Sequence, residues 1–153
     1  AWVAAQRHMG FEMDPRELSA KDKRLLKSVT LWWKQNREWM MSANILRLPC
    51  IDKSVIAEIQ VNSKGDHFVV FAGQNAASEL SSSAPLVLAG LDSESMYNIS
   101  LLNTKEIKSL GKSEEGLLTK KLMLSGQFLM TQGLQLPKVF PANMMVIEGD
   151  KAA

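Results

Sequence analysis

The sequence predicts a mainly β fold, in which one long α-helix precedes a C-terminal antiparallel β-sandwich over residues 45–153. Apolar residues recur at three- and four-residue spacing between Leu25 and Met41, which is typical of an amphipathic helix. From Ile45 onward, apolar and polar residues alternate in short segments bounded by Gly, Pro, Asn or Ser. No helical pattern separates these segments, which favours an antiparallel sandwich.

The helix is expected over residues 20–41. Ser19 and Asp22 have capping-box spacing, so the Ser19 hydroxyl can accept a hydrogen bond from a free backbone N–H while the acid complements the helix dipole. Pro49 forbids helix beyond Leu48. The apolar stripe of this helix comprises Leu25, Leu26, Val29, Trp32, Trp33, Asn36, Trp39 and Met40.

The strands are expected to begin with a hairpin. In "VIAEIQV" (55–61), Val55, Ala57, Ile59 and Val61 face one way while Glu58 and Gln60 face the other. The segment "NSKGD" has turn chemistry, and "HFVVFAG" (67–73) pairs back on the first strand. The pattern therefore predicts an antiparallel ribbon.

Further short strands are expected along the rest of the chain. "PLVLAGL" (85–91) and "MYNISLL" (96–102) repeat the alternation with "DSES" between them, and "FLM" (128–130) and "KVFPANMMVI" (138–147) complete the sandwich. Residues 76–84 and 111–116 are interpreted as surface loops.

Composition excludes several classes of function. The 153 residues carry a net charge of +2 without a basic run, so we expect no nucleic-acid partner. One cysteine and two histidines leave no disulfide and too few ligands for a zinc cluster, so we expect no metal or cofactor. No apolar run approaches the roughly 20 residues of a membrane helix, and no signal segment is evident, so the cytoplasm is favoured.

Three tryptophans create a problem for a chain of this size. Trp32, Trp33 and Trp39 would each bury roughly 150–250 Å², or on the order of 4–6 kcal/mol apiece as an upper bound. A sandwich shelters one side of a helix but not adjacent tryptophans that point in divergent directions. Because the chain also begins with Ala1 inside "AWVAA", we expect a fragment whose missing upstream part covers these rings.

Motifs along most of the chain resemble the microbial α-galactosidases of glycoside hydrolase family thirty-six. They are "HMGFEMDPRELSAKDKRLLKSVTLWWKQNREWM" followed by "ILRL", then "PLVLAGLDSESMYNI" and "SGQFLMTQGLQLP". The sequence departs from the family pattern at Ala43-Asn44, where a Gly is usual, and at His8-Met9, where a small or polar residue is commoner.

The resemblance implies that residues 1–44 are the end of a catalytic (β/α)₈ barrel, with its last strand, turn and helix, and that residues 45–153 are the sandwich. It implies a parent enzyme that releases terminal α-linked galactose from oligosaccharides with retention, and that is often an oligomer. The family's two catalytic aspartates lie upstream of the matched region, so no catalytic residue is assigned in this chain. The alternative is a stand-alone module that binds carbohydrate or another protein, with the tryptophan face as the docking surface.

Glu12 and Asp14 are the carboxylates most worth comparing with catalytic ones. Retaining glycosidases place two carboxyl groups about 5–5.5 Å apart on opposite sides of the scissile bond. Residues two apart on an extended strand point in parallel, and Pro15 favours a turn. We therefore predict a hinge that leads into the helix. The remaining possibility is that Glu12 or His8 supports an active site from the rim of the barrel.

The remaining candidate groups are predicted to be structural. His67 is expected to be a solvated strand-start residue, and Cys50 a buried small hydrophobe without a partner base. Met residues at strand spacing are interpreted as core filler, and three aromatic residues as core, although aromatic faces can stack on sugars. These residues are Met123, Met130, Met144, Met145, Phe68, Phe71 and Tyr97. The sequon Asn98-Ile-Ser100 lies within a predicted strand, and such triplets arise often by chance.

Overall fold

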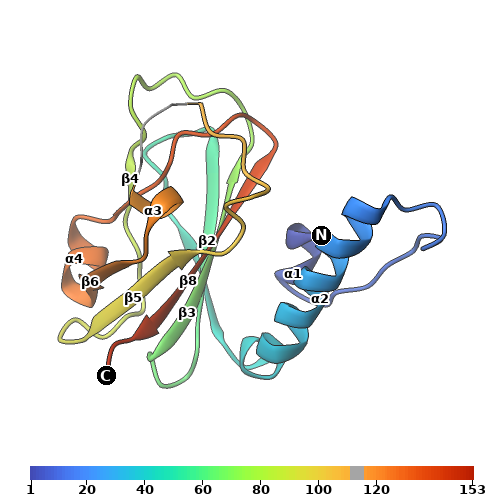
Figure 1. Cartoon of the computed structure of the whole chain (residues 1–153). Coiled ribbons are helices and arrows are strands. Elements are labelled where there is room, and N and C mark those ends of the chain that lie inside the picture. Colours follow the sequence, from blue (N-terminus) through green and yellow to red (C-terminus); the bar gives the residue numbers. More distant parts are fainter. Residues whose placement is uncertain (111–115) are drawn as a thin grey trace. The chain divides into compact units, whose positions relative to one another are not determined.

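The computed structural model describes residues 1–110 and 116–153 (Figure 1). These residues form two compact units, Ala1–Ala43 and Asn44–Ala153. The predicted loop at 111–116 lies outside the described residues except for Gly116. Among the helices of the described ranges, none combines the length and the apolar character needed to cross a membrane. The helices are α1 (Trp2–Ala5), α2 (Ala20–Met41), α3 (Gly116–Thr119) and α4 (Gly126–Thr131).

Helix α2 confirms the prediction of one long helix with the expected bounds. The backbone N–H of Asp22 donates to the Ser19 hydroxyl oxygen at 3.1 Å, and that hydroxyl donates to the Asp22 carboxylate at 2.6 Å. The backbone bond and the side-chain bond between Ser19 and Asp22 therefore both stabilise the first turn of the helix. At the other end, the Ser42 N–H bonds to the carbonyl of Trp39 at 3.2 Å.

The start of the first unit differs from the expectation of a barrel strand. Residues Trp2–Ala5 form one helical turn, in which the Ala5 N–H donates to the Ala1 carbonyl at 3.1 Å. A strand needs a neighbouring strand for its ladder of hydrogen bonds, and none pairs with this segment in residues 1–43, all of which are described. Local helical bonds satisfy the backbone instead.

The three tryptophans of α2 are half-buried. The ring of Trp2 meets the ring of Trp32 edge-on, with 5.3 Å between their centroids. The indole N–H of Trp33 donates to the Arg7 carbonyl at 2.9 Å, and the indole N–H of Trp39 donates to the Asn36 side chain at 2.9 Å. The N-terminal segment of the unit thus gives part of the cover that was expected from a missing upstream body.

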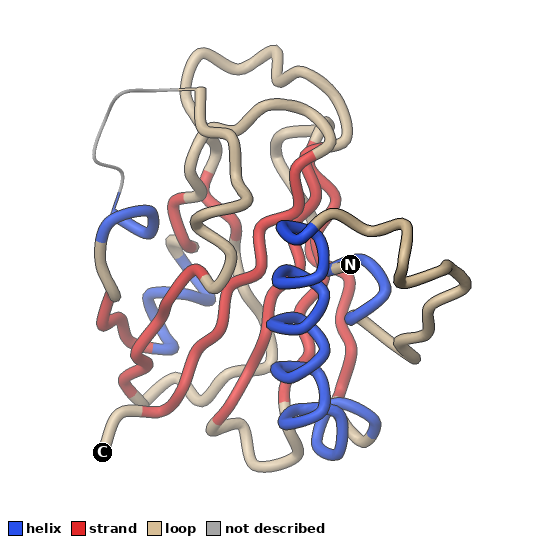
Figure 2. Tube along the Cα trace, turned by 45° about the vertical axis from the view of Figure 1, so that its right-hand side comes forward, coloured by secondary structure: helices blue, strands red, loops and turns tan. Residues whose placement is uncertain are grey.

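The second unit is built on a six-stranded antiparallel sheet with the order β1-β2-β3-β8-β5-β6 (Figure 2). Strands β4 and β7 form a separate antiparallel pair. The strands are β1 (Asn44–Leu48), β2 (Val55–Val61), β3 (His67–Gln74), β4 (Pro85–Leu86), β5 (Met96–Leu101), β6 (Leu122–Ser125), β7 (Leu134–Gln135) and β8 (Asn143–Lys151).

The predicted hairpin is present as β2 and β3, with Val61 opposite Phe68. In its turn, the Asn62 side-chain oxygen accepts hydrogen bonds from the backbone N–H groups of Asp66 and His67. Gln60, which is predicted to face the opposite way from Ile59 and Val61, has a fully buried side chain. Gln60 lies opposite Val69 and donates to the Glu58 carboxylate at 3.2 Å, which reduces the cost of its burial.

Two other predicted strands differ from the structure. The "FLM" segment lies in helix α4, because the Ser125 hydroxyl caps the helix by accepting a hydrogen bond from the Phe128 N–H at 3.1 Å. The "PLVLAGL" segment forms only the two-residue strand β4, which pairs with β7 and not with "MYNISLL". The predicted surface loop at 76–84 is confirmed as a segment without regular structure, whose residues are exposed or half-buried.

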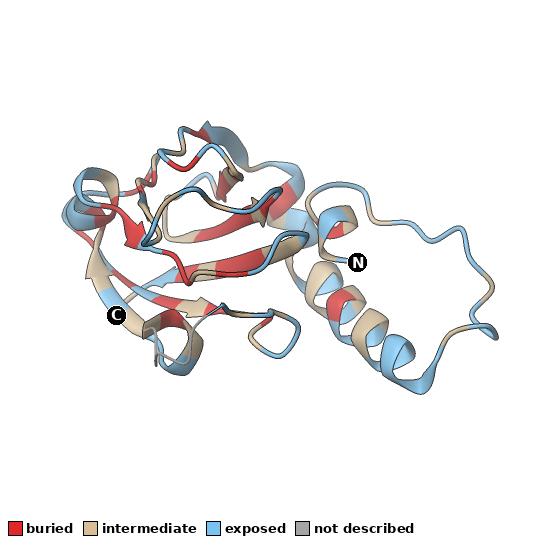
Figure 3. Ribbon diagram, turned by 90° about the horizontal axis from the view of Figure 1, so that it is seen from above, coloured by how far each residue is buried: buried red, intermediate tan, exposed pale blue. Residues whose placement is uncertain are grey.

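The core of the second unit lies between the six-stranded sheet and the layer that contains β4, β7 and α4. Buried residues concentrate on the strands of the sheet (Figure 3). Members of the core from the sheet are Ala57, Ile59, Phe68, Val70, Tyr97, Ile99, Met145 and Ile147, and members from the facing layer are Leu86, Leu88, Leu129, Leu134 and Leu136. This arrangement is the predicted antiparallel sandwich.

Candidate functional site

The turn before α2 holds Asp14 in an ion pair of its own. The guanidinium of Arg16 donates to Oδ1 of Asp14 at 3.0 Å and to Oδ2 at 2.7 Å, and the Arg16 backbone N–H donates to Oδ1 at 2.8 Å. This side-chain pair, with help from the backbone bond, lowers the pKa of Asp14. Glu12 and His8 lie exposed in the same loop. The structure gives Asp14 a local partner in the turn.

His67 is enclosed by carboxylates and is not the solvated residue that the sequence suggested. Its side chain is 18% exposed, its Nδ1 atom contacts the Asp150 carboxylate, and its Nε2 atom lies 3.6 Å from the Glu148 carboxylate. The cause is strand register, because His67 pairs with Asp150 across β3 and β8. The three side chains tie the ends of these two strands together.

Cys50 lies half-buried just after β1. Its Sγ atom contacts the Leu48 carbonyl oxygen at 3.6 Å. Burial raises the pKa of the Cys50 thiol, which outweighs the opposing effects of a backbone hydrogen bond and nearby cations. A raised pKa disfavours the thiolate that a nucleophile or metal ligand requires.

The aromatic residues weighed as a sugar platform are core residues, as predicted. Phe68, Phe71 and Tyr97 are at most 1% exposed, and the rings of Phe68 and Tyr97 meet edge-on at 5.6 Å. The Tyr97 hydroxyl donates to the Gly65 carbonyl at 2.6 Å. Their faces are not accessible for stacking on a pyranose ring.

The predicted methionine filler is only partly in the core. Met145 is fully buried, and Met130 is half-buried against the core, whereas Met123 is 61% exposed on β6. The prediction is wrong for Met123, because β6 is an edge strand and the outer face of this strand is uncovered. Met144 is half-buried.

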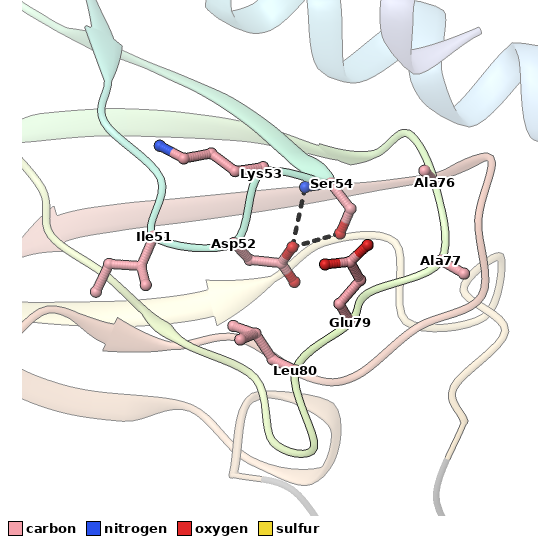
Figure 4. A pocket seen from close by; sticks show the side chains of 8 residues that line it. All are labelled: Ile51, Asp52, Lys53, Ser54, Ala76, Ala77, Glu79 and Leu80. Carbon is pink, nitrogen blue, oxygen red and sulfur yellow. Dashed lines mark hydrogen bonds between the residues drawn. The ribbon is translucent and has the colours of Figure 1, made fainter.

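A pocket of about 330 Å³ opens in the second unit between the segment that precedes β2 and the loop that follows β3 (Figure 4). Asp52 and Ser54 lie on one side and Glu79 on the other, with the Glu79 side chain directed toward Ser54. The Ser54 N–H donates to the Asp52 carboxylate at 2.9 Å, and the Ser54 hydroxyl donates to the same carboxylate oxygen. The remaining lining residues are Ile51, Lys53, Ala76, Ala77 and Leu80.

Asp52 is the buried acid of this pocket, 9% exposed. Burial alone would raise the pKa of Asp52, but hydrogen bonds from Ser54 and Ser78, aided by the charge of Lys138, together lower it. The ionised carboxylate is therefore favoured, and its acceptor sites are occupied by neighbouring donors.

The pocket network joins three segments that are distant in sequence. The Gln74 amide donates to the Ser54 hydroxyl at 2.6 Å and to the Ala76 carbonyl at 2.8 Å. The ammonium of Lys138 donates to the Leu80 carbonyl at 2.9 Å. Asp52, Gln74 and Lys138 were not identified as site residues from the sequence. The only feature of the sequence that could have indicated them is that each is a polar residue near the end of a strand. The network fastens the 76–81 loop to the sheet.

Within residues 1–110 and 116–153, no group of three or more His, Cys, Asp or Glu side chains is arranged to hold a metal ion. The carboxylates of Asp14, Asp52 and Asp150 are engaged by Arg16, Ser54 and His67, respectively. Glycoside hydrolysis instead needs two carboxyl groups that flank a substrate, one of which attacks while the other donates a proton.

The sequence of this chain is similar to a known family domain and to a known enzyme. The model of the glycosyl hydrolase family 36 C-terminal domain matches residues 55–151. An α-galactosidase of Escherichia coli is 24% identical over 151 residues, which cover 95% of this chain and 21% of that protein. The chain thus spans about a fifth of the length of this curated relative.

Solved structures share the fold of almost the whole chain. The α-galactosidase AgaB of Geobacillus stearothermophilus superposes with a TM-score of 0.77 at 21% identity, covering 98% of this chain and 18% of that one. The α-galactosidase of Lactobacillus brevis gives a TM-score of 0.79 at 13% identity, covering 99% of this chain and 19% of that one. A variant of AgaA from Geobacillus stearothermophilus was solved in complex with raffinose and gives a TM-score of 0.78 at 22% identity, covering 98% of this chain and 18% of that one.

Proposed function

Since this chain belongs to glycosyl hydrolase family 36, matching the C-terminal domain of that family, we propose that it is the C-terminal, non-catalytic part of an α-galactosidase. The parent enzyme hydrolyses terminal α-linked galactose from oligosaccharides with retention. Both catalytic aspartates belong to the part of the parent upstream of Ala1. The substrates of the parent enzyme are galactosides such as raffinose.

One observation carries the proposal: the likeness covers nearly all of this chain but about a fifth of each relative. The match of residues 55–151 accounts for the sandwich. Structural likeness over 98% of the chain extends to the first unit as well. We assign residues 1–44 to the end of the catalytic barrel, with α2 as its last helix, and residues 45–153 to the C-terminal sandwich.

The first unit has the character of a part that packs on a larger body. Among residues 1–43, only Ala5, Val29 and Met40 are buried apolar residues. The indoles of Trp32, Trp33 and Trp39 stay half-exposed despite their local contacts. Aromatic surface of this size is normally buried in stable proteins. We propose that the upstream barrel packs on these three rings, and that the assembled parent is a homo-oligomer.

The test compares the 153-residue chain with the same chain joined to its natural upstream sequence. We expect hydrolysis of nitrophenyl-α-galactoside by the joined protein alone, and no galactose binding by the short chain in calorimetry. Light scattering of the joined protein measures its oligomeric state. Hydrolysis or tight galactose binding by the short chain would contradict the proposal and favour a stand-alone carbohydrate-binding module.

A further inference from the structure

An apolar groove of about 460 Å³ lies within the first unit, between the loop that precedes α2 and one face of this helix. Phe11 and Met13 of the loop and Leu31 of the helix contribute to its lining, and these side chains are 44%, 49% and 51% exposed. Exposed apolar side chains gathered in one hollow mark a surface that another body covers. The tryptophan contacts described above are made by other residues.

Three lysines, Lys23, Lys27 and Lys34, line the same groove. No Asp or Glu is among its lining residues. Of the acidic residues near the groove in sequence, Asp14 and Asp22 are engaged by Arg16 and Ser19, and the exposed Glu12 and Glu17 are not among the lining residues. The groove therefore offers apolar surface and positive charge together, which is complementary to an apolar segment that carries carboxylates.

The lysines follow one another along the helix. At a rise of about 1.5 Å per residue, the positions of Lys23 and Lys34 are about 16 Å apart along the helix axis. An extended segment of about five residues spans the same length. A row of charges of this length beside an apolar groove is complementary to a single polypeptide segment.

We propose that this groove receives an acidic, apolar polypeptide segment from the upstream part of the parent α-galactosidase. This inference rests on the proposed function, since it takes the occupant from the upstream four-fifths of the parent's length. The segment places apolar side chains against Phe11, Met13 and Leu31 and its carboxylates beside the three lysines. It thereby fixes the loop that carries Glu12 and Asp14.

The test measures access to the groove by thiol labelling. Cysteine is introduced as Met13→Cys in a Cys50→Ser background, both in the short chain and in the chain joined to its natural upstream sequence. We expect the labelling rate at position 13 to fall at least tenfold in the joined protein. Met123→Cys, on edge strand β6, is the control for intrinsic reactivity because Met123 is similarly exposed, and its rate is expected to change less than twofold.

Charge reversal tests the role of the lysines in the same joined protein. The double variant Lys23→Glu with Lys27→Glu is expected to restore labelling at position 13 to within threefold of the short-chain rate. The matched variant Lys21→Glu with Arg24→Glu changes the net charge equally in the same turns of α2 but outside the groove, and it is expected to keep position 13 protected.

The outcomes separate this inference from the proposed function. If the joined protein hydrolyses galactoside but position 13 stays reactive, or if both charge reversals act alike, the groove has no acidic occupant while the α-galactosidase assignment stands. If the joined protein has no such activity, the assignment itself fails. Binding of the joined protein to phosphatidylserine vesicles that depends on Lys23 and Lys27 would overturn the polypeptide occupant in favour of a lipid surface.

Discussion

Gly149 shows how one residue sets the packing of the sandwich. It lies opposite Phe68 in the register of β3 and β8. A Cβ atom at position 149 would lie 2.2 Å from two ring carbons of Phe68. The buried ring of Phe68 therefore occupies the space above this glycine and meets Tyr97 edge-on. Any side chain at position 149 competes with the ring for the same volume.

Gly149→Ala is expected to lower the free energy of unfolding by about 1–3 kcal/mol, because the buried Phe68 ring has to shift. Urea denaturation followed by circular dichroism measures the change. Gly73→Ala in β3 is the control, since its Cβ would meet Met144 at an ordinary 3.6 Å, and it is expected to stay within about 0.5 kcal/mol of the unsubstituted chain. Equal effects of the two substitutions would contradict the packing argument.

Asp52→Asn is expected to lower the free energy of unfolding at pH 7 by about 1–2 kcal/mol, because a carboxylate that accepts several hydrogen bonds is replaced. The pKa of Asp52 is lowered from 3.8 in the folded chain. The carboxylate therefore contributes stability above pH 3.8, and this contribution is lost as the pH falls through the folded pKa.

Urea denaturation at a series of pH values checks this prediction. The difference between Asp52→Asn and the unsubstituted chain is expected to shrink as the pH falls below 3.8. Substitution of the exposed Glu79, across the same pocket, provides the control for a general charge effect. A difference that is constant with pH would show that the charge of Asp52 contributes nothing.

Among the elements, α2 was predictable from local sequence, whereas the pairing of strands distant in sequence was not. Ser19, the apolar stripe and Pro49 give the bounds of α2, because helix hydrogen bonds and caps form between near neighbours. The hairpin β2–β3 was predictable for the same reason. The pairing of β4 with β7 joins residues about 50 apart, and no local pattern specifies that partner.

The same distinction explains which site residues were missed. The hinge character of Asp14 was apparent from Pro15 and the cap that follows, although its partner Arg16 was not identified. Asp52, Gln74 and Lys138 come together only through the folded sheet and loop. "FLM" was too short for its period to separate strand from helix, so the Ser125 cap decided the outcome.

Ser19→Ala is expected to destabilise α2 by about 1 kcal/mol, because the Asp22 N–H loses the acceptor that Ser19 provides. Amide hydrogen exchange at the first turn of α2 reports the change. Ser19→Thr is the control, since threonine also caps helices, and it is expected to keep most of the protection. Identical exchange in the alanine and threonine variants would exclude a role for the cap.

At the scale of the whole molecule, the two units differ in how much apolar core each one has to stabilise it. The second unit has a contiguous core of aliphatic and aromatic residues. The first has one long helix, one helical turn and few buried apolar residues. Most of the stability of a helix in a protein comes from packing of its amphipathic face against other elements. Autonomous folding is therefore expected only of the sandwich.

The chain 44–153 is expected to unfold in a single cooperative urea transition, whereas the peptide 1–43 is expected to show little helix by circular dichroism. Trifluoroethanol added to the peptide serves as the control for its intrinsic helical propensity. A cooperative transition of the peptide alone would contradict its assignment as part of a larger body, and a broad, non-cooperative response of 44–153 would contradict an independent core.

The central place of β8 in the sheet has a consequence for how the protein is made. β8 is the last strand along the chain, yet it lies between β3 and β5 and bonds to both. During translation, the edges of β3 and β5 that bond to β8 stay unpaired until the ribosome has released residues through Lys151. A premature stop shortly before Asn143 would remove the strand that joins two halves of the sheet, leaving a product for chaperones and proteases.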